Sequence, residues 1–421
     1  MTLSIEDAQR FDTQDPLHSY REDFLFPKSQ TGRPVVYFTG NSLGLQPRKV
    51  QEAVLQEIED WACYGVDGHF RAHTPWVDYH ETLIPPLARL VGAMPEEVTA
   101  MNSLTVNLHL LMVSFYQPTA KRCKIIIEPN AFPSDRYAVE SQIRYHGFNP
   151  AEHLIIAPEG PHGTLDHAAL YDILTQHGDE IALLLMGGVN YYTGQLLDMA
   201  EITRHAHQAG ITVGFDLAHA IGNVPLRLHD WGVDFAAWCS YKYLNGGPGG
   251  VAGAFVHKRH LGKPSIPRFE GWWGHDKATR FAMPDQFTPL PTVEAWQLSN
   301  VPILLMAALR PSLAIFDQAG MHALRTKSLQ MWQYFKAALD ALNDPRIQII
   351  TPEEDAQHGC QLSIRIENVG RSVYEALTSA DVYVDWREPD VIRAAPVPLY
   401  NSFEDIYHFM TRLQQALKEH A

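Results

Sequence analysis

Two neighbouring stretches of the sequence carry side chains that could do covalent chemistry. Asp216 and His219 come at the end of one short apolar segment, and Lys242 follows the next such segment, just before a glycine-rich turn. A buried lysine has a lowered pKa, and its free amine can form an imine with the aldehyde of pyridoxal 5′-phosphate (PLP). An aspartate can hold the pyridine nitrogen of PLP protonated, so that the ring acts as an electron sink. Although a single lysine or aspartate is more often structural, the ordered pair beside the glycines predicts a PLP site.

The phosphate of such a cofactor needs an anion pocket, and the start of an expected helix offers one. Residues 104–116 are apolar nearly all round, which predicts a buried helix. Leu104 and Thr105 open this helix, so free backbone N–H groups and a hydroxyl could hold a dianion there. Considered alone, however, the segment is more typical of an ordinary helix N-cap.

A second polar segment, FPSD at residues 132–135, follows another expected strand. Phe132 could stack on a pyridine ring, and Ser134 or Asp135 could add polar contacts. Core packing is the alternative interpretation of Phe132. We therefore include this segment among the candidate cofactor contacts.

A metal site finds less support than a PLP site. Asp216 and His219 are close in sequence and His205 and His207 lie upstream, but no HExxH motif or Cys/His grouping with metal spacing accompanies them. His205 and His207 lie on an expected helix at a spacing that points them to different faces. GxSxG, Walker and GxGxxG motifs are also missing, so the common hydrolase, NTPase and Rossmann classes lack support. We expect no metal.

The elements that must position these residues alternate between strand and helix. Helical patterns, such as 198–209, lie between several short apolar segments rich in β-branched residues. This alternation is typical of an α/β fold with a mainly parallel sheet between helices, and segments that are apolar throughout suit strands covered on both faces. The expected strands are 124–128, 153–157, 181–186, 211–216, 234–240 and 251–256.

Beyond residue 300 the pattern changes to that of a smaller α+β unit. Residues 301–316 and 322–342 have helical patterns. Residues 361–367 alternate as an antiparallel strand with one solvent-exposed face would. The chain ends in an expected helix, 403–418, that Ser402 would begin in a capping box.

These patterns predict a division of the chain into three parts. We expect a large PLP-binding domain over 48–300 and a small C-terminal domain over 301–421, with residues 1–47 packing against the small domain. The large domain would begin with an amphipathic helix near residue 50, whose apolar face includes Ile58 and Trp61.

The composition excludes several classes of function. Of the 421 residues, 46% are hydrophobic and 19% charged, which suits a compact chain with a sizeable core. A net charge of −15 without a Lys/Arg cluster disfavours binding to nucleic acid or a membrane surface. The apolar runs are shorter than the ~20 residues that span a bilayer, and the first residues lack the layout of a signal peptide. The four cysteines are far apart, which indicates free thiols in a reducing cytoplasm.

Longer segments of the chain together resemble a known family. They are NSLGLQP (41–47), SLTVNLHLLM (103–112), FPSD (132–135), GFDLAHA (214–220), HDWGVDFAAWCSYKYLNGGPGG (229–250), GWWGH (271–275) and APVPLYNSF (395–403). They resemble the kynureninase family, which belongs to the fold type I PLP enzymes, close to the class V aminotransferases. The short motifs also occur in related PLP enzymes, whereas the longest segment, GWWGH and APVPLYNSF are highly specific. The resemblance implies a seven-stranded type of sheet in the large domain.

The resemblance implies roles for the residues around the cofactor. Lys242 would be the Schiff-base lysine, Asp216 the partner of the pyridinium nitrogen, and His219 a neighbour of the ring and its 3′-oxygen. Tyr241 would contact the phosphate and act as an acid late in the reaction. The remaining cofactor contacts that it implies within the chain are Leu104, Thr105, Phe132, Pro133, Ser134 and Asp135.

The resemblance also implies that the site is shared between two subunits. Trp272 and Asn300 would complete the cofactor site of the partner subunit, which makes a homodimer the working unit. Arg393 would bind the α-carboxylate of the substrate, because its rigid fork suits a carboxylate. Where relatives carry a small hydroxyl residue, this chain has Gly187, so we expect no cofactor contact there.

The activity implied is hydrolytic cleavage of the Cβ–Cγ bond of L-kynurenine to anthranilate and L-alanine, in tryptophan degradation or NAD precursor synthesis. His69, Ser299 and Asn300 would lie at the aryl end of the substrate, where they could bind an extra phenol hydroxyl. 3-Hydroxykynurenine, which would give 3-hydroxyanthranilate and L-alanine, is therefore expected to be a good substrate. The alternatives are another class V PLP enzyme, such as an aminotransferase or a desulfurase, and a PLP-fold protein that binds ligand without turnover.

Overall fold

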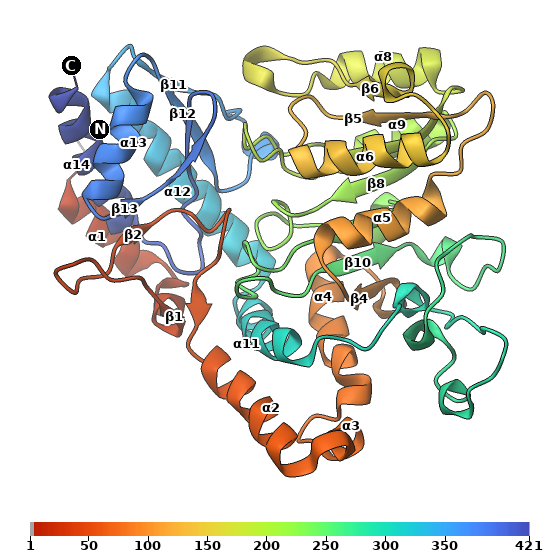
Figure 1. Ribbon diagram of the computed structural model, residues 1–421. Coiled ribbons are helices and arrows are strands. Elements are labelled where there is room, and N and C mark those ends of the chain that lie inside the picture. The colour runs from red at the N-terminus through yellow and green to blue at the C-terminus, as the bar shows by residue number, and fades with distance from the viewer. Residues whose placement is uncertain (1–3, 421) are drawn as a thin grey trace.

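The computed structural model describes residues 4–420, and its larger part is built around a seven-stranded sheet (Figure 1). The strands, in spatial order, are β4 (Val98–Ala100), β10 (Gly253–Val256), β9 (Phe235–Trp238), β8 (Thr212–Asp216), β7 (Ile181–Gly187), β5 (Lys124–Ile127) and β6 (Leu154–Ile156). Neighbours from β9 to β6 run parallel, whereas β10 pairs antiparallel with both β9 and β4. The predicted mainly parallel sheet is confirmed, and β4 is a strand that the sequence pattern did not reveal.

Helices cover both faces of this sheet, as its apolar strands predict. They include α5 (Leu104–Phe115), α6 (Pro133–Tyr145), α8 (His167–His177) and α9 (Met199–Gln208). In β7, where every residue is buried, Leu183 and Leu185 pack in one apolar cluster with residues of α5 and α6. Leu184 and Met186 face the other way and pack with residues of α8 and α9. A strand buried on both faces has no polar side, which is why its sequence is apolar throughout.

The smaller part of the chain is an antiparallel four-stranded sheet with helices against it (Figure 1). Its strands, in spatial order, are β11 (Ile347–Ile349), β12 (Leu362–Ile366), β15 (Val391–Ala394) and β14 (Asp385–Arg387). The helices that share its apolar cluster are α12 (Met321–Leu342), α13 (Gly370–Ser379) and α14 (Phe403–Glu419). The predicted capping box is confirmed, because Ser402 Oγ accepts the Asp405 N–H at 3.1 Å and Asp405 Oδ2 accepts the Ser402 N–H at 3.1 Å.

The N-terminal segment packs against this smaller part. Helix α1 (Ile5–Gln14) contacts α14, and β2 (Val36–Tyr37) pairs in parallel with β13 (Val382–Tyr383). Figure 1 shows the N-terminal helix beside the C-terminal one. The Asp12 carboxylate also accepts the backbone N–H of Phe403, at 2.7 Å, where α14 begins. These contacts agree with the expected packing of the N-terminal segment, while the boundaries near residues 47 and 300 stay predictions.

One expectation about the C-terminal sheet is wrong. The alternating segment at 361–367 suggests a strand with one face in water, but β12 lies between β11 and β15 and every residue of it except Arg365 is buried. The Ser363 hydroxyl donates to the Tyr192 carbonyl at 2.6 Å, in the large part of the chain. The polar side of the strand therefore packs against protein, and alternation alone cannot distinguish that from solvent.

The amphipathic helix expected near residue 50 forms as α2 (Val50–Tyr64), but only part of its apolar side, including Val54, packs against the core. Ile58 is 42% and Trp61 65% exposed. Glu57 and Asp60 are buried instead, and each accepts a hydrogen bond from a neighbouring segment. An apolar helix face left in solvent marks an interaction surface.

The remaining elements connect these parts of the chain. They are β1 (Phe24–Leu25), β3 (Gln46–Pro47), α3 (Gly68–Arg71), α4 (Ile84–Val91), α7 (Pro150–His153), α10 (Leu228–Trp231) and α11 (Ile303–Ala319), besides short 3-10 turns. Within residues 4–420 no single helix is long and apolar enough to cross a membrane. Only α11 and α12 taken together, bent by 81° at their junction, reach the required length and hydropathy.

Candidate active site

A pocket of about 200 Å³ lies where β5, β7 and β8 end. These strands are neighbours and run parallel, so their carboxyl ends meet at one edge of the sheet. The residues predicted from the sequence that line it are Leu104, Thr105, Phe132, Ser134, Asp135, Asp216, His219, Tyr241 and Lys242. Pro133 is the first residue of α6, beside them. Gly187, for which no cofactor contact is expected, also lines the pocket.

Lys242 and His219 are in direct contact in this pocket. Lys242 Nζ donates to His219 Nε2 at 3.0 Å. Burial, to which the charge of Lys242 adds, holds the pKa of His219 well below its usual range, so the imidazole is neutral and can accept this bond. Asp216 is buried close by, and its Oδ1 accepts the Ala218 N–H at 2.7 Å. Burial raises the pKa of Asp216, and the charge of Lys242 opposes that shift.

Glu128 and Asp135 add two more buried carboxyl groups to the same pocket. Burial raises the pKa of Glu128 to about 7. Burial, with Asp216 and Glu128 nearby, raises the pKa of Asp135 well above its usual range. Carboxyl groups gathered in this way favour a cationic partner, and a protonated pyridine nitrogen is one. The residues present therefore fit the ring of PLP. Sequence reasoning missed Glu128, whose one signal is a charged residue at the end of an apolar strand.

The N-termini of α5 and α6 form another wall of the pocket. Thr105 Oγ1, in the first turn of α5, lies 2.8 Å from Ser134 Oγ, in the first turn of α6. Ser103, the N-cap of α5, makes no side-chain capping bond to any residue that the structure describes. The first N–H groups of α5 therefore keep their capacity to bind an anion. This wall fits a phosphate, as Leu104 and Thr105 predict.

Aromatic side chains flank the pocket. Phe132 is 42% exposed and meets the Tyr191 ring edge to face, with ring centres 5.1 Å apart. Lys242 Nζ lies 5.8 Å from the centre of the Phe132 ring. Phe132 is thus a pocket residue and not a core residue. Burial raises the pKa of Tyr241, so its phenol is protonated at neutral pH.

Arg393, on β15, is buried next to the pocket. Its Nη1 donates to the Tyr191 carbonyl at 2.8 Å, and its guanidinium lies 5.9 Å from the centre of the Tyr191 ring, which lines the pocket. Its Nη2 donates to the Asp385 carboxylate. The small domain thus supplies a cation beside the lysine and carboxylates of the large one.

Four residues expected from the family resemblance lie outside this pocket. His69 is on α3, and Ser299 and Asn300 are exposed. Trp272 is 40% exposed, and its Nε1 donates to the Arg280 carbonyl at 3.1 Å. Trp272 and Asn300 are expected to reach the site of a partner subunit. The roles of all four residues therefore stay predictions.

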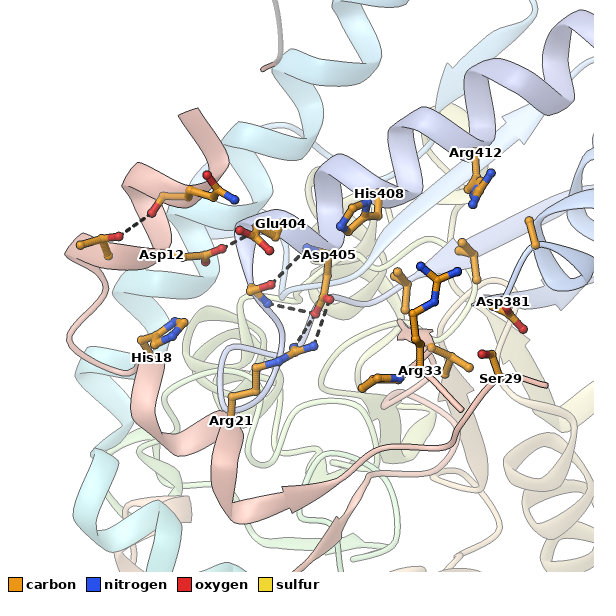
Figure 2. Close-up of a pocket in the computed structure, with 18 residues that line it drawn as sticks. Asp12, His18, Arg21, Ser29, Arg33, Asp381, Glu404, Asp405, His408 and Arg412 are labelled. Carbon is orange, nitrogen blue, oxygen red and sulfur yellow. Dashed lines mark hydrogen bonds and ion pairs between the residues drawn. The ribbon is translucent and has the colours of Figure 1, made fainter. Parts of the chain in front are cut away.

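A larger cavity, of about 870 Å³, lies between the N-terminal segment and α14 (Figure 2). Polar side chains dominate it, but several are already paired. Arg21 Nη1 donates to Asp405 Oδ2 at 2.7 Å, and Asp12 accepts the Glu404 N–H at 3.0 Å. These pairs tie the N-terminal segment to α14, which gives the cavity a structural explanation.

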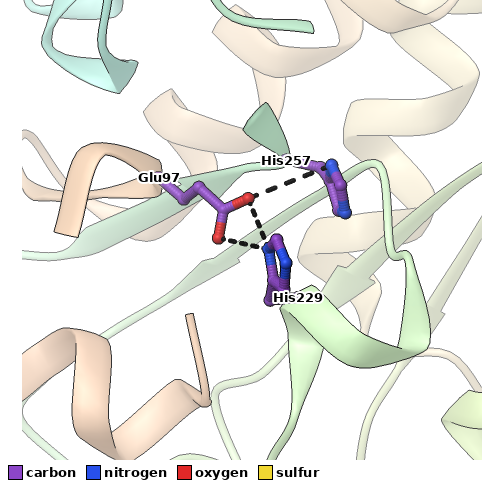
Figure 3. Close-up of side chains that lie close together, drawn as sticks. All are labelled: Glu97, His229 and His257. Atoms are coloured by element: carbon purple, nitrogen blue, oxygen red, sulfur yellow. Dashed lines mark hydrogen bonds and ion pairs between the residues drawn. The ribbon is translucent and has the colours of Figure 1, made fainter. Parts of the chain in front are cut away.

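Glu97, His229 and His257 form a cluster with the spacing of a metal site (Figure 3). The Glu97 carboxylate, however, already accepts hydrogen bonds from the His229 ring at 2.9 Å and from the backbone N–H groups of Met94 and Lys258, at 2.8 and 2.7 Å. These bonds join the turn before β4, helix α10 and the segment after β10, and they account for the buried carboxylate without a cation.

A lysine after β9, an aspartate at the end of β8 and an anion-binding wall, on a sheet of this topology, define a fold type I PLP-dependent enzyme. Solved structures share the fold. A cysteine desulfurase from Thermococcus onnurineus NA1 matches with a TM-score of 0.76 at 17% identity, covering 100% of this chain and 99% of that one. One from Escherichia coli matches with a TM-score of 0.77 at 18% identity, covering 96% and 98%.

Sequence relatives define the family more narrowly. Kynureninases from Myxococcus xanthus and Xanthomonas euvesicatoria are each 52% identical to this chain, over 413 and 416 residues, and at least 97% of every chain is covered. The model of the kynureninase C-terminal domain matches residues 324–413. The chain belongs to the kynureninase family, as its motifs predict. It is therefore a PLP-dependent hydrolase of carbon–carbon bonds in the kynurenine pathway of tryptophan breakdown.

Proposed function

We propose that the pocket around Lys242 binds PLP and hydrolyses the Cβ–Cγ bond of L-kynurenine to anthranilate and L-alanine, and that of 3-hydroxykynurenine to 3-hydroxyanthranilate and L-alanine. The observation that carries this assignment is the 3.0 Å contact of Lys242 Nζ with the neutral, buried His219, beside Asp216. When bound, PLP draws electrons from the α-carbon of the substrate, which weakens the bonds around it.

Lys242 has two tasks in this proposal. Its amine would hold the cofactor through the aldehyde carbon and, when free, would take the proton from the substrate α-carbon. His219 keeps the lysine amine in place by accepting a hydrogen bond, and its neutral state adds no charge. Asp216 keeps the pyridine nitrogen protonated, with Asp135 beside it.

Other groups in the pocket bind the phosphate and donate a proton. The N–H groups of Leu104 and Thr105 and the hydroxyls of Thr105 and Ser134 hold the phosphate, while Phe132 covers the ring. Tyr241 is protonated at neutral pH, so it can donate a proton to the Cβ atom after the Cβ–Cγ bond breaks.

Arg393 binds the substrate α-carboxylate. Its guanidinium is buried, lies beside the pocket and presents N–H groups in a fixed fork, which suits a carboxylate. A carboxylate bound there leaves the other end of the substrate, with its ketone and aryl ring, to extend from the cofactor.

Product analysis tests the proposed reaction. We expect the PLP-loaded protein to convert L-kynurenine into equal amounts of anthranilate and alanine, and Lys242→Ala, the control, to form neither product. Kynurenic acid formed together with pyridoxamine phosphate would identify an aminotransferase instead. Retention of PLP without any product would identify a binding protein.

The exposed apolar surface supports a homodimer. Phe70 on α3 contacts Phe281, and Phe281 in turn contacts Trp272. Phe70 is 62%, Phe281 53% and Trp61, on α2, 65% exposed. Large exposed aromatic groups of this kind are typical of surfaces that a partner covers. We propose that a second copy covers them and that Trp272 and Asn300 reach the cofactor site across that interface.

We propose a cytoplasmic location because the four cysteines are free thiols. Cys63 is exposed and Cys123, Cys239 and Cys360 are buried, and all four are free thiols. Free thiols persist in reducing compartments. A thiol titration of freshly isolated protein in denaturant should therefore find four reactive groups, and a smaller number would count against this location.

A further inference from the structure

Asp385 joins two arginines next to the pocket. It lies directly opposite Arg393 in the register of β14 and β15. Its Oδ2 accepts hydrogen bonds from Arg393 Nη2, from the Ser42 hydroxyl and, at 3.1 Å, from Arg387 Nη2. The side chain of Arg393 is 1% exposed and that of Asp385 13%. The contact therefore lies in the interior, where charges interact strongly.

Nη1 and Nη2 of Arg393 are already hydrogen-bonded, and this affects how a ligand carboxylate can bind there. A guanidinium binds a carboxylate with two N–H groups either end on, through Nη1 and Nη2, or side on, through Nε and Nη2. Either geometry needs an N–H of Nη2. In the structure Nη2 donates to Asp385 and, at 3.3 Å, to Ser42, while Nη1 donates to the Tyr191 carbonyl at 2.8 Å. The Ser42 hydroxyl itself donates to Asp385 Oδ2, so Asp385 and Ser42 lie on one side of Nη2 and occupy it there, while the buried Nε of Arg393 has no hydrogen-bond partner among residues 4–420.

We propose that Asp385 is an internal competitor for the substrate carboxylate, because both bind to Nη2 of the buried Arg393. This inference rests on the proposed role of Arg393. The displaced carboxylate remains with Arg387, whose Nε is buried and has no hydrogen-bond partner among residues 4–420. One hydrogen bond is exchanged for others, and no covalent bond changes.

The charges of this group explain why a carboxylate can make the exchange. Two arginines and one aspartate leave one positive charge, and an entering carboxylate neutralises it. A neutral group in place of the carboxylate could not replace Asp385 on a buried guanidinium, because a buried cation needs an anionic partner. Asp385 therefore makes binding selective for amino acids over their uncharged derivatives.

The test compares L-kynurenine with its neutral α-amide in the PLP-loaded enzyme. Asp385→Asn removes the competing charge, so we expect the KM for kynurenine to fall about 3- to 10-fold, as when a binding-competent state is freed, while the KM or inhibition constant for the amide falls further, because the amide no longer faces an anion that it cannot replace. The control is Asp390→Asn in the same hairpin, which loses an equal charge from an ion pair with Arg365 and should leave both constants unchanged. An unchanged or raised KM for kynurenine in Asp385→Asn would overturn the proposal.

Two further measurements distinguish an error in the carboxylate site at Arg393 from an error in the role of Asp385. If Arg393→Lys preserves the preference for kynurenine over its amide, the proposed carboxylate site is wrong, whatever Asp385 does. If Asp385→Asn does not fold, a crystal structure of the wild-type enzyme with bound L-alanine decides. We expect Asp385 to have left Arg393 Nη2 for Arg387, and an intact Asp385–Arg393 bond beside a doubly hydrogen-bonded alanine carboxylate would refute the idea.

Discussion

At the scale of single residues, burial sets the protonation state that each group brings to the reaction. His219 is held neutral, Tyr241 is held protonated, and the carboxyl groups of Asp135 and Glu128 are harder to ionise than in water. Burial also raises the pKa of Asp216, and the charge of Lys242 opposes that shift. In this pocket His219 accepts a hydrogen bond from the lysine, Asp216 is the proposed anion for the ring nitrogen, and Tyr241 is the proposed acid.

Asp216→Asn tests the role of that anion. An amide of nearly the same shape cannot keep the pyridine nitrogen protonated, so we expect PLP to stay bound while turnover of kynurenine falls by ~10²-fold or more. The absorbance of bound cofactor and the steady-state rate measure the two effects. Near-normal turnover with PLP bound would show that Asp216 does not have this role.

Lys242 should be the residue that carries the cofactor. Borohydride reduction of the PLP-loaded protein, followed by peptide mapping, should leave the pyridoxyl group on Lys242 and leave Lys258, which follows β10 at the opposite edge of the sheet, unlabelled. The reason is that Lys242 Nζ points into the pocket, 3.0 Å from His219 Nε2. Label on any other lysine would exclude the assignment.

At the scale of elements, the site depends on β8 and β9 keeping their alignment, since Asp216 ends β8 and Lys242 follows β9. Asp234, directly before β9, supports that alignment because its Oδ2 accepts the Val213 N–H of β8 at 2.8 Å. Burial raises the pKa of Asp234, but hydrogen bonds from His207 and His260 and the charge of Arg259 outweigh burial and lower it overall.

Asp234→Asn should therefore destabilise the fold in a pH-dependent way. Because the pKa of Asp234 in the folded protein is lower than the ~3.9 of an unfolded chain, its contribution is present above that pH and is lost as the pH falls. We expect a loss of roughly 1.5–3 kcal/mol in the free energy of unfolding at pH 7 that shrinks below about pH 4. Denaturant titration at several pH values measures it.

The exposed ion pair of Asp230 with Arg227 is a matched control for that experiment. Asp230→Asn should cost no more than ~1 kcal/mol, because solvent screens the pair. Equal losses in Asp230→Asn and Asp234→Asn at neutral pH would contradict the structural role given to Asp234.

At the scale of the whole molecule, the pocket contains the residues for the cofactor but not those expected for the aryl end of the substrate. His69 lies beside Phe70 on α3, Trp272 contacts Phe281, which contacts Phe70, and Asn300 is exposed outside the pocket. The proposed homodimer, in which each subunit completes the site of the other, would bring these residues to a pocket.

Replacing Trp61 and Phe70 together by serine should weaken that dimer. Both side chains are more than 60% exposed, so the fold loses little, whereas an interface would lose two aromatic anchors. Light scattering should show dissociation at a concentration where the parent is a dimer, with most activity lost. Tyr145→Ser, at another exposed aromatic residue, is the control and should remain dimeric. An active monomeric parent would contradict the proposal.

His69→Phe tests which end of the substrate His69 meets. If its imidazole binds the phenol hydroxyl, kcat/KM should fall about tenfold for 3-hydroxykynurenine, the size of one lost hydrogen bond, and less for kynurenine. His73→Phe is the control on the neighbouring turn and should change neither value. An equal fall for both substrates would show that His69 does not bind the hydroxyl.

The features that the sequence predicted depend on interactions between residues that are close in the chain. The apolar strands, the capping box at Ser402, the open N-terminus before Leu104 and the order of Asp216 and Lys242 depend on neighbours in the chain, so a sequence pattern contains them. Strand ends of a parallel sheet meet at one edge, which is why that order already predicts a cofactor site.

Other features depend on which distant segments pack together, and a sequence pattern does not show those contacts. Glu128 becomes a pocket carboxyl because β5 ends near β8, on the other side of β7, and Ser363 of β12 is buried because its hydroxyl bonds to Tyr192 in the large part of the chain. Asp385 is committed to Arg393 because a hairpin register and Ser42, from the far end of the chain, bring the three groups together. Burial and pairing of charge are properties of the packed chain, so the tertiary structure alone assigns them.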